Sequence, residues 1–117
     1  MSRRLCFALD LVDDADLIAE YEAAHAAGAV WPQVVQGISQ AGYESMEIWR
    51  TGDRLFLIAE VADDFPRPIA PHLAEVDAVW QQRMDRFQKR LPHGDPQEKW
   101  TAMTRIFSLD EQVDSKS

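Results

Sequence analysis

The stretch YESMEIWRTGDRLFLIAEVA, residues 43–62, decides the fold class. It holds two apolar segments rich in strand-favouring residues, 43–50 and 54–62, joined by Thr51-Gly52-Asp53. A short glycine-containing connection between two such segments is typical of a β-hairpin. The sequence therefore predicts an antiparallel pair of strands in the middle of the chain.

One strand and two helices are expected before this hairpin. Apolar residues alternate with others over 5–11, which is the period of a strand. A helix is expected from an aspartate cap, Asp13 or Asp14, to Gly28. Pro32 suits the first turn of a second helix, and Gly42 suits its end.

After the hairpin we expect a proline-rich loop, a longer helix and a last strand. The loop spans 63–71 and the turn PHGDPQ spans 92–97. Alternation of Met103, Phe107 and Leu109 predicts the final strand, followed by a frayed polar tail. The helix between loop and turn has an apolar stripe at helical spacing, made of Val76, Trp80, Met84, Phe87 and Leu91.

This order of elements, β-α-α-β-β-α-β, is the split βαβ pattern of the ferredoxin-like α+β fold. We expect a single domain over residues 1–110 and a tail over 111–117, with a four-stranded antiparallel sheet and helices on one face only. The other face then needs a cover, and a second copy of the chain is the simplest one. A homodimer in the form of a dimeric α+β barrel, with pockets at the concave sheet faces, is the expected assembly.

The composition limits the partners. The 117 residues carry a net charge of −8, with a sequence pI near 4.7. Such an acidic chain disfavours binding to nucleic acid or to an anionic membrane. A single cysteine, Cys6, excludes an intramolecular disulfide framework and fits a reducing compartment. No stretch reaches the roughly 18 apolar residues of a membrane span, so a cytoplasmic location is expected.

Tyr21 and His25 are the first candidates for chemistry. They are four residues apart, so both lie on one face of the expected helix and continue its apolar stripe. Histidine exchanges protons near neutral pH, and a neighbouring tyrosine can orient a hydroxyl or relay a proton. Spacing alone favours a packing role, with the histidine bonded to a backbone carbonyl.

The four tryptophans indicate a site that stacks on rings. Trp31 precedes a proline and offers a flat apolar face with one N–H donor, which suits a sugar or a heterocycle as well as a hydrophobic plug. Trp80 lies on the core stripe of the long helix, where packing is favoured unless the stripe borders a pocket. Trp49 and Trp100 flank expected strands.

Asp10 lies within the first strand, on the face opposite the leucines, where carboxylates are uncommon. It could line a polar pocket or lie on an exposed face, and Glu47 and Arg105 have the same two alternatives. The sequence contains no metal-binding or nucleotide-binding motif. The histidines have no metal-ligand spacing, and the chain has no GxGxxG, Walker A or GxSxG pattern.

The segment EYEAAHAAGAVWP contains Y-x-x-x-H-x(5)-W-P, and with it the chain resembles the L-rhamnose mutarotase family, including relatives that act on L-fucose. The resemblance spans about residues 4–109. Further matching parts are MEIWRTGDRLFLIAEV, VWQQRM and the closing TAMTRIFSL. It implies interconversion of the α and β anomers of a free sugar on a dimeric ferredoxin-like scaffold, without a cofactor or a metal.

By the same resemblance, His25 corresponds to the proton donor and Tyr21 to a sugar-binding tyrosine. Trp80 falls where the family has a tryptophan that contacts the sugar. Two positions depart from rhamnose-type members: Trp80-Gln81 stands in place of a tandem Trp-Trp, and Met46 stands in place of a sugar-contacting tyrosine. These departures make L-fucose or another deoxyhexose as suitable a substrate as L-rhamnose.

Mutarotation opens the hemiacetal to the aldehyde and closes it on the other face. It requires an acid at the ring oxygen, for which we expect His25, and a base at the anomeric hydroxyl, for which water or a carboxylate such as Asp10 would serve. Two rival functions use the same fold: a dimeric monooxygenase acting on an aromatic substrate, and a non-enzymatic domain that binds a small ligand.

Overall fold

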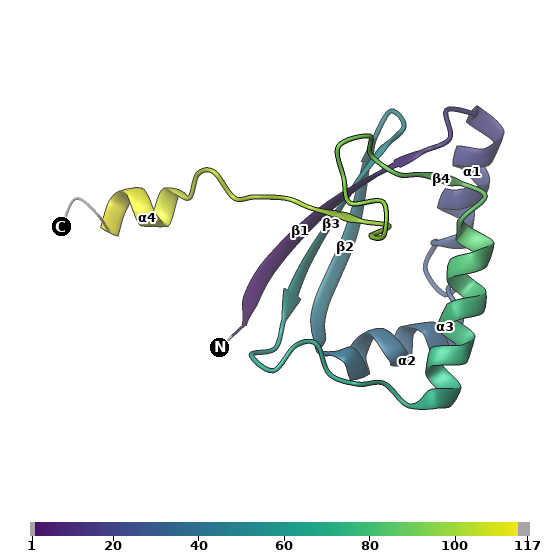
Figure 1. The fold of residues 1–117 in the computed structure, drawn as a ribbon, viewed down its shortest axis with the longest axis horizontal. Helices are drawn as coiled ribbons and strands as arrows, with labels where there is room; N and C mark the ends of the chain where they lie inside the picture. Colours follow the sequence, from purple (N-terminus) through teal and green to yellow (C-terminus); the bar gives the residue numbers. More distant parts are fainter. Residues whose placement is uncertain (1, 115–117) are drawn as a thin grey trace.

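The computed structural model describes residues 2–114 and is built around a curved antiparallel sheet. Its three long strands are β1 (Arg3–Leu11), β2 (Tyr43–Thr51) and β3 (Arg54–Val61), with β1 in the centre between β3 and the short β4 (Gln88–Lys89). The sheet order is β2-β3-β1-β4, and β5 (Thr101–Ala102) also pairs with β1 (Figure 1). The hairpin expected between residues 43 and 62 is therefore confirmed.

The register of the sheet decides which side chains face the helices. Residues directly opposite one another on antiparallel strands point to the same face. Ala59 of β3 is opposite Met46 of β2. Leu57 of β3 is opposite Ile48 of β2 on one side and Phe7 of β1 on the other. Alternate residues of β3 are buried on this inner face, namely Leu55, Leu57, Ala59 and Val61.

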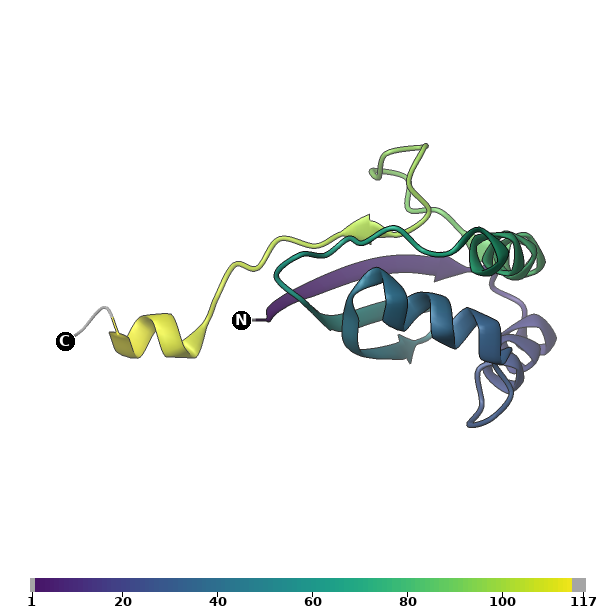
Figure 2. The same ribbon diagram turned by 90° about the horizontal axis from the view of Figure 1, so that it is seen from below.

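Three helices lie on one side of the sheet: α1 (Ala15–Ala24), α2 (Pro32–Ala41) and α3 (Pro71–Met84) (Figures 1 and 2). The carboxylate of Asp14 caps α1 by accepting hydrogen bonds from the backbone N–H groups of Asp16 and Leu17, each at 3.0 Å. Pro32 begins α2 as expected, and Gly42 ends it with a φ of 112°, a left-handed conformation that favours glycine.

Two helices end earlier than the sequence predicts. The first helix stops at Ala24 and not at Gly28, because the N–H of His25 already bonds the carbonyl of Glu22, and a tight turn follows. The long helix stops at Met84. The chain then turns to reach the edge of β1, where the N–H of Val12 donates to the carbonyl of Phe87 at 2.8 Å. Phe87 and Leu91 remain buried although they are not helical.

The expected final strand over 103–109 is wrong. After residue 100 the pairing with β1 covers Thr101–Ala102 and ends with the bond from the Met103 N–H to the Cys6 carbonyl at 2.8 Å. Two short segments, β4 and β5, therefore share the edge position of the fourth strand. The chain then leaves the sheet as an extended arm that ends in α4 (Leu109–Asp114), well away from the body (Figure 1). The expected unstructured tail is thus helical up to Asp114, and its last three residues lie outside the described part.

The core lies at the end of the sheet where α1, α2 and α3 converge. Its buried cluster consists of Leu11, Tyr21, Val34, Leu55, Trp80, Met84 and Phe87. The topology and the helices on a single face confirm the ferredoxin-like α+β fold. Within residues 2–114, no helix is both long enough and apolar enough to cross a membrane.

Candidate active site

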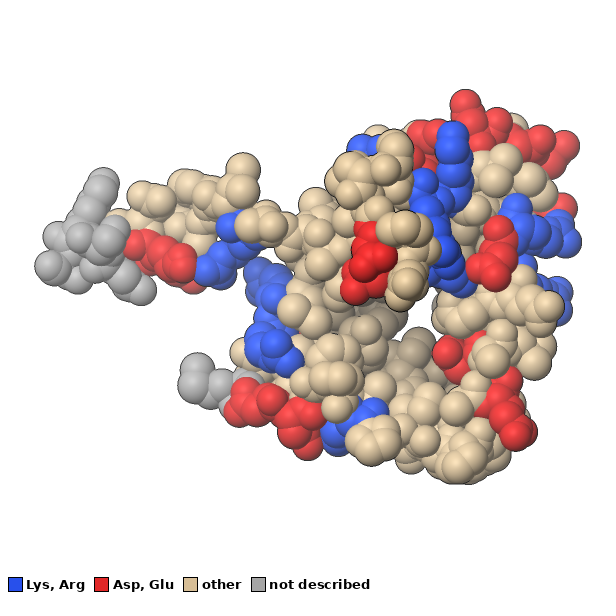
Figure 3. Space-filling view, in the orientation of Figure 1, with Lys and Arg blue, Asp and Glu red and all other residues tan. Residues whose placement is uncertain are grey.

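A cavity of about 800 Å³ lies between the inner face of the sheet and helices α1, α2 and α3. Its volume is within the usual range for small-ligand pockets, roughly 300–1,000 Å³. Figure 3 shows the molecule hollowed at this place, with walls that are mainly uncharged. Aliphatic side chains from α2 and the hairpin make up much of the lining, including Val34, Val35, Ile38, Ile48 and Leu57.

His25 and Tyr21, which helical spacing predicts to be neighbours, both line this cavity. Their rings pack against each other with centroids 4.2 Å apart. His25 is the residue that ends α1, and its Nδ1 lies 2.7 Å from the carbonyl oxygen of Tyr21. Because a carbonyl only accepts hydrogen bonds, Nδ1–H is the donor. The other ring nitrogen, Nε2, is therefore the one left to exchange a proton with a ligand.

Tyr21 is only 3% exposed, and its hydroxyl is held by an amide. Gln88 Nε2 donates to Tyr21 Oη at 3.2 Å. Burial raises the pKa of Tyr21 above its ordinary value of 10.0, more than the bond from Gln88 lowers it. The phenol therefore keeps its proton at neutral pH and can donate a hydrogen bond to a ligand.

Gln88 carries an unpaired polar atom. Its Oε1 is buried and has no hydrogen-bond partner among residues 2–114. The bridge that places Gln88 opposite Leu11 sends its side chain to the inner face of the sheet, beside Tyr21. Nothing in the sequence marked this residue, because it belongs to a two-residue strand that the apolar spacing assigned to a helix.

Trp80 forms one wall of the cavity and Trp31 lies behind it. Trp80 is 6% exposed and packs edge-on against His25, with ring centroids 5.6 Å apart. Trp31 does not line the cavity; its ring packs edge-on against Trp80 at 5.0 Å, and the guanidinium of Arg83 lies 5.7 Å from its centroid. The structure therefore gives Trp31 a supporting position for Trp80.

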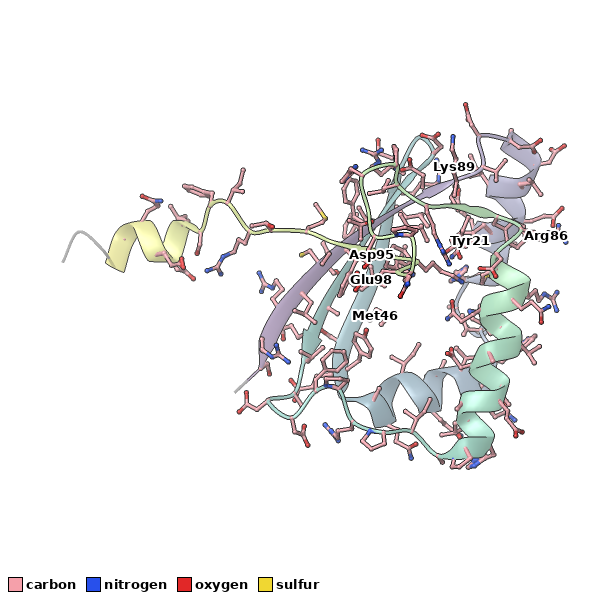
Figure 4. The ribbon with its side chains drawn as sticks, viewed as in Figure 1. Tyr21, Met46, Arg86, Lys89, Asp95 and Glu98 are labelled. Atoms are coloured by element: carbon pink, nitrogen blue, oxygen red, sulfur yellow. The ribbon has the colours of Figure 1, made fainter. Side chains whose placement is uncertain are left out.

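Met46 lines the cavity from β2, on the side opposite Tyr21, which comes from α1 (Figure 4). The register explains this position, since Met46 pairs with the buried Ala59. Tyr43, at the start of the same strand, also lines the cavity. Methionine places an apolar surface here, so this wall makes contacts with the carbon skeleton of a ligand and not with its hydroxyl groups.

Asp10 is not brought to the cavity. It lies on the outer face of the sheet, where Arg54 Nε donates to its carboxylate at 2.7 Å. This bond to Asp10 raises the pKa of the Arg54 guanidinium. Glu47 is also exposed on that face, where it accepts a hydrogen bond from the indole of Trp49 at 3.3 Å. Arg105 lies in the arm, paired with Glu111 at 2.6 Å.

The sequence pattern did not predict a polar group of cavity residues on α3 and in the loop that precedes β5. Asp77, Gln81 and Lys99 line the cavity together with Trp100. Lys99 Nζ donates to Gln81 Oε1 at 2.9 Å and to the Gln81 carbonyl at 3.2 Å, and it pairs with Asp85 at 2.8 Å. Asp77 and Gln81 lie on the same helical face as Trp80, and this spacing could have marked them as cavity residues. Their link to Lys99 depends on the tertiary fold and has no signal in the sequence.

A second hollow of about 370 Å³ adjoins the first, and Tyr21, His25 and Ile48 line both. Glu22 lies in this second hollow, and its carboxylate is engaged by Arg50 at 2.8 Å. Tyr21 and His25 thus stand between the two hollows. In the described part of the chain, no three His, Cys, Asp or Glu side chains come together in a group that could hold a metal ion.

Comparisons with known proteins identify the family of the chain. The chain is 45% identical to the L-fucose mutarotase of Xanthomonas campestris pv. campestris over 115 residues, which cover 95% of this chain and 91% of that protein. Its fold matches the crystal structure of an L-rhamnose mutarotase from Formosa agariphila with a TM-score of 0.65 and 19% identity, covering 92% and 98% of the two chains. The sequence profile described as L-rhamnose mutarotase matches residues 4–109. The chain therefore belongs to the L-rhamnose mutarotase family and is an isomerase of sugar anomers.

Proposed function

We propose that this chain interconverts the α and β anomers of a free deoxyhexose, with His25 as the acid that protonates the ring oxygen. The observation that carries the proposal is the convergence of His25, Tyr21 and Trp80 on one cavity. These three residues supply a proton carrier, a hydroxyl donor and a flat apolar wall. Such a set suits a small ring that carries hydroxyl groups.

The bond from His25 Nδ1–H to the Tyr21 carbonyl supports this role. It fixes the ring and leaves Nε2 as the position for the transferred proton. When Nε2 protonates the ring oxygen and a base takes the proton of the anomeric hydroxyl, the bond between the ring oxygen and the anomeric carbon breaks and the free aldehyde forms. The aldehyde then closes on its other face: Nε2 takes back the proton of the attacking hydroxyl, and the base returns its proton to the new anomeric hydroxyl. A positioned acid or base of this kind contributes roughly 10²–10⁴-fold to a rate.

The apolar walls favour a deoxy sugar. Trp80 can stack on the C–H face of the ring, while Met46, Ile48 and Leu57 offer a surface for a methyl group in place of a hydroxymethyl group. The relative from Xanthomonas is named for L-fucose, and Met46 and Gln81 depart from rhamnose-type members. We therefore propose L-fucose as the preferred substrate and L-rhamnose as the closest competitor.

We also infer a homodimer in the cytoplasm. The arm that follows β5 exposes several large apolar side chains and extends away from the body (Figure 1). Ile106 is 95% exposed, and Phe107, Leu109 and Val113 are each more than 60% exposed. A second copy of the chain, packed against the outer sheet face and this arm, would cover them. The single free thiol, Cys6, supports a reducing compartment.

The proposed function is tested by exchange NMR on a panel of free sugars at anomeric equilibrium, with catalytic amounts of protein. We expect saturation of one anomeric signal to pass to the other faster for L-fucose than for L-rhamnose, and faster for both than for D-glucose. Absence of acceleration for every deoxyhexose would contradict the proposed function. A monomer in light scattering at micromolar concentration would contradict the homodimer alone.

A further inference from the structure

The proposed reaction needs a group that takes the proton of the anomeric hydroxyl, and the cavity offers a carboxylate for it. Asp77 is the one acidic side chain among residues 2–114 that lines the main cavity. Other nearby carboxylates have cationic partners: Asp10 pairs with Arg54, Glu22 with Arg50, and Asp85 with Lys99. A carboxylate already held by a cation is a poor proton acceptor, which leaves Asp77 as the candidate.

The position of Asp77 on α3 places it beside the sugar-stacking wall. Residues 77, 80, 81 and 84 follow the i, i+3, i+4, i+7 spacing of one helical face. Trp80 and Met84 are buried, so this face is directed into the molecule. His25 packs against the edge of Trp80, and Asp77 lies about one helical turn from Trp80. A ring stacked on Trp80 would therefore meet His25 and Asp77 at separate positions on its rim.

The neighbours of Asp77 orient its carboxylate. A lysine only donates hydrogen bonds, so the bond from Lys99 Nζ to the Gln81 side chain must end on the amide oxygen. The amide nitrogen of Gln81 then faces Asp77 and donates to its Oδ1 at 3.3 Å. Within the described residues no hydrogen bond to Asp77 Oδ2 is found. Lys99, through Gln81, thus fixes one oxygen of Asp77 and leaves the other for a ligand.

We infer that Asp77 is the catalytic base, a role that rests on the proposed function of the chain. The anomeric hydroxyl gives its proton to Asp77 Oδ2, and the electron pair of that O–H bond forms the carbonyl bond at C1. The bond from C1 to the ring oxygen breaks, and the ring oxygen takes the proton from His25 Nε2. After rotation about C1–C2 both transfers run in reverse and close the ring as the other anomer. No further reactant is required.

The test compares three substitutions in the full-length protein by exchange NMR with L-fucose. Asp77→Asn keeps the shape of the side chain and an oxygen for the Gln81 bond, so the fold should persist. We expect kcat to fall about 100-fold, near the lower end of the effect of a general base, with KM changed less than threefold. Glu75→Gln removes the same charge from an exposed position of α3 and should retain wild-type kcat. Asp77→Gly creates room for an added carboxylate, and formate should restore at least part of its rate.

Three results would overturn the inference. If Asp77→Asn keeps kcat within twofold of Glu75→Gln, Asp77 is not the base, although the proposed function stands. If the rate is lost but formate restores nothing to Asp77→Gly, and sugar affinity falls as much as the rate, Asp77 has a structural role only. If the wild-type protein fails to accelerate exchange for any deoxyhexose, the proposed function and this inference fail together.

Discussion

Removal of the Trp31 ring should weaken sugar binding, although Trp31 itself does not contact the sugar. Trp31 packs edge-on against Trp80 at 5.0 Å, while its own ring does not line the cavity. In Trp31→Ala, Trp80 loses this support and becomes free to tilt away from the position in which it meets a ligand. We therefore expect a change in KM and little change in kcat, since the bond from His25 to the Tyr21 carbonyl is unaffected.

The size of the effect follows from the contacts. Truncation of a fully buried tryptophan to alanine costs about 3–5 kcal/mol. Trp31 is only partly buried, so we expect a loss of about 2–3 kcal/mol in the free energy of unfolding. Of this loss in the free energy of unfolding, the edge-to-face contact between Trp31 and Trp80 accounts for about 0.5–1.5 kcal/mol, and the guanidinium of Arg83 over the Trp31 ring for about 0.5–1 kcal/mol. If about 1 kcal/mol of the free energy of sugar binding depends on the position of Trp80, KM rises about fivefold.

Urea unfolding followed by circular dichroism measures the first quantity, and exchange NMR at graded sugar concentrations measures the second. Trp31→Phe is the matched control, because a smaller ring keeps an edge against Trp80; its stability loss and its KM increase should each be less than half as large. An unchanged KM in Trp31→Ala despite the lost stability would refute the supporting role. So would a direct nuclear Overhauser contact between the sugar and the Trp31 indole.

Three further predictions concern other groups of the cavity. Gln88→Met removes a buried oxygen without a partner, which favours stability, and the bond to Tyr21 Oη, which opposes it. The free energy of unfolding should therefore stay within about 1 kcal/mol of wild type, and a loss above about 2 kcal/mol in urea unfolding would contradict this balance. Burial raises the pKa of Tyr21 in the folded state, so its contribution to stability is fully present below about pH 10 and is lost as the pH rises through the folded pKa. The urea midpoint should therefore fall less steeply with pH above pH 10 in Tyr21→Phe than in wild type. Equal slopes of midpoint against pH in the two proteins would contradict this contribution of Tyr21. Lys99→Met removes the donor that orients Gln81 and the partner of Asp85, so stability should fall by about 1–2 kcal/mol and kcat by several-fold, whereas an unchanged kcat would exclude the orienting role.

Much of the fold could be predicted because its signals are local. The alternation in the hairpin, the capping aspartate at 14 and the glycine at 42 act within a few residues of where they stand. The end of the long helix could not be predicted in this way. Phe87 and Leu91 continue the helical spacing, but the edge of β1 offers unpaired backbone groups, and pairing with them outweighs the local preference for helix.

In the candidate site, too, local spacing predicts some residues and tertiary packing places the others. Tyr21 and His25 could be predicted as neighbours because four residues of helix place them together. Trp31 was expected at the ligand because it precedes a proline and offers a flat apolar face, yet the tertiary packing places it behind Trp80. The pairing of Asp10 with Arg54, and that of Gln81 with Lys99, joins residues far apart in the sequence. No spacing rule predicts such pairs from one sequence.

The central claim is that His25 carries the proton to the ring oxygen, and exchange NMR on His25→Gln measures it most directly. This substitution keeps a polar side chain of similar length but cannot carry a proton at neutral pH. With L-fucose we expect the exchange between anomeric signals to fall at least about 100-fold while the circular dichroism spectrum stays that of the wild type. Retention of more than a tenth of the wild-type exchange rate by a folded His25→Gln protein would contradict the account.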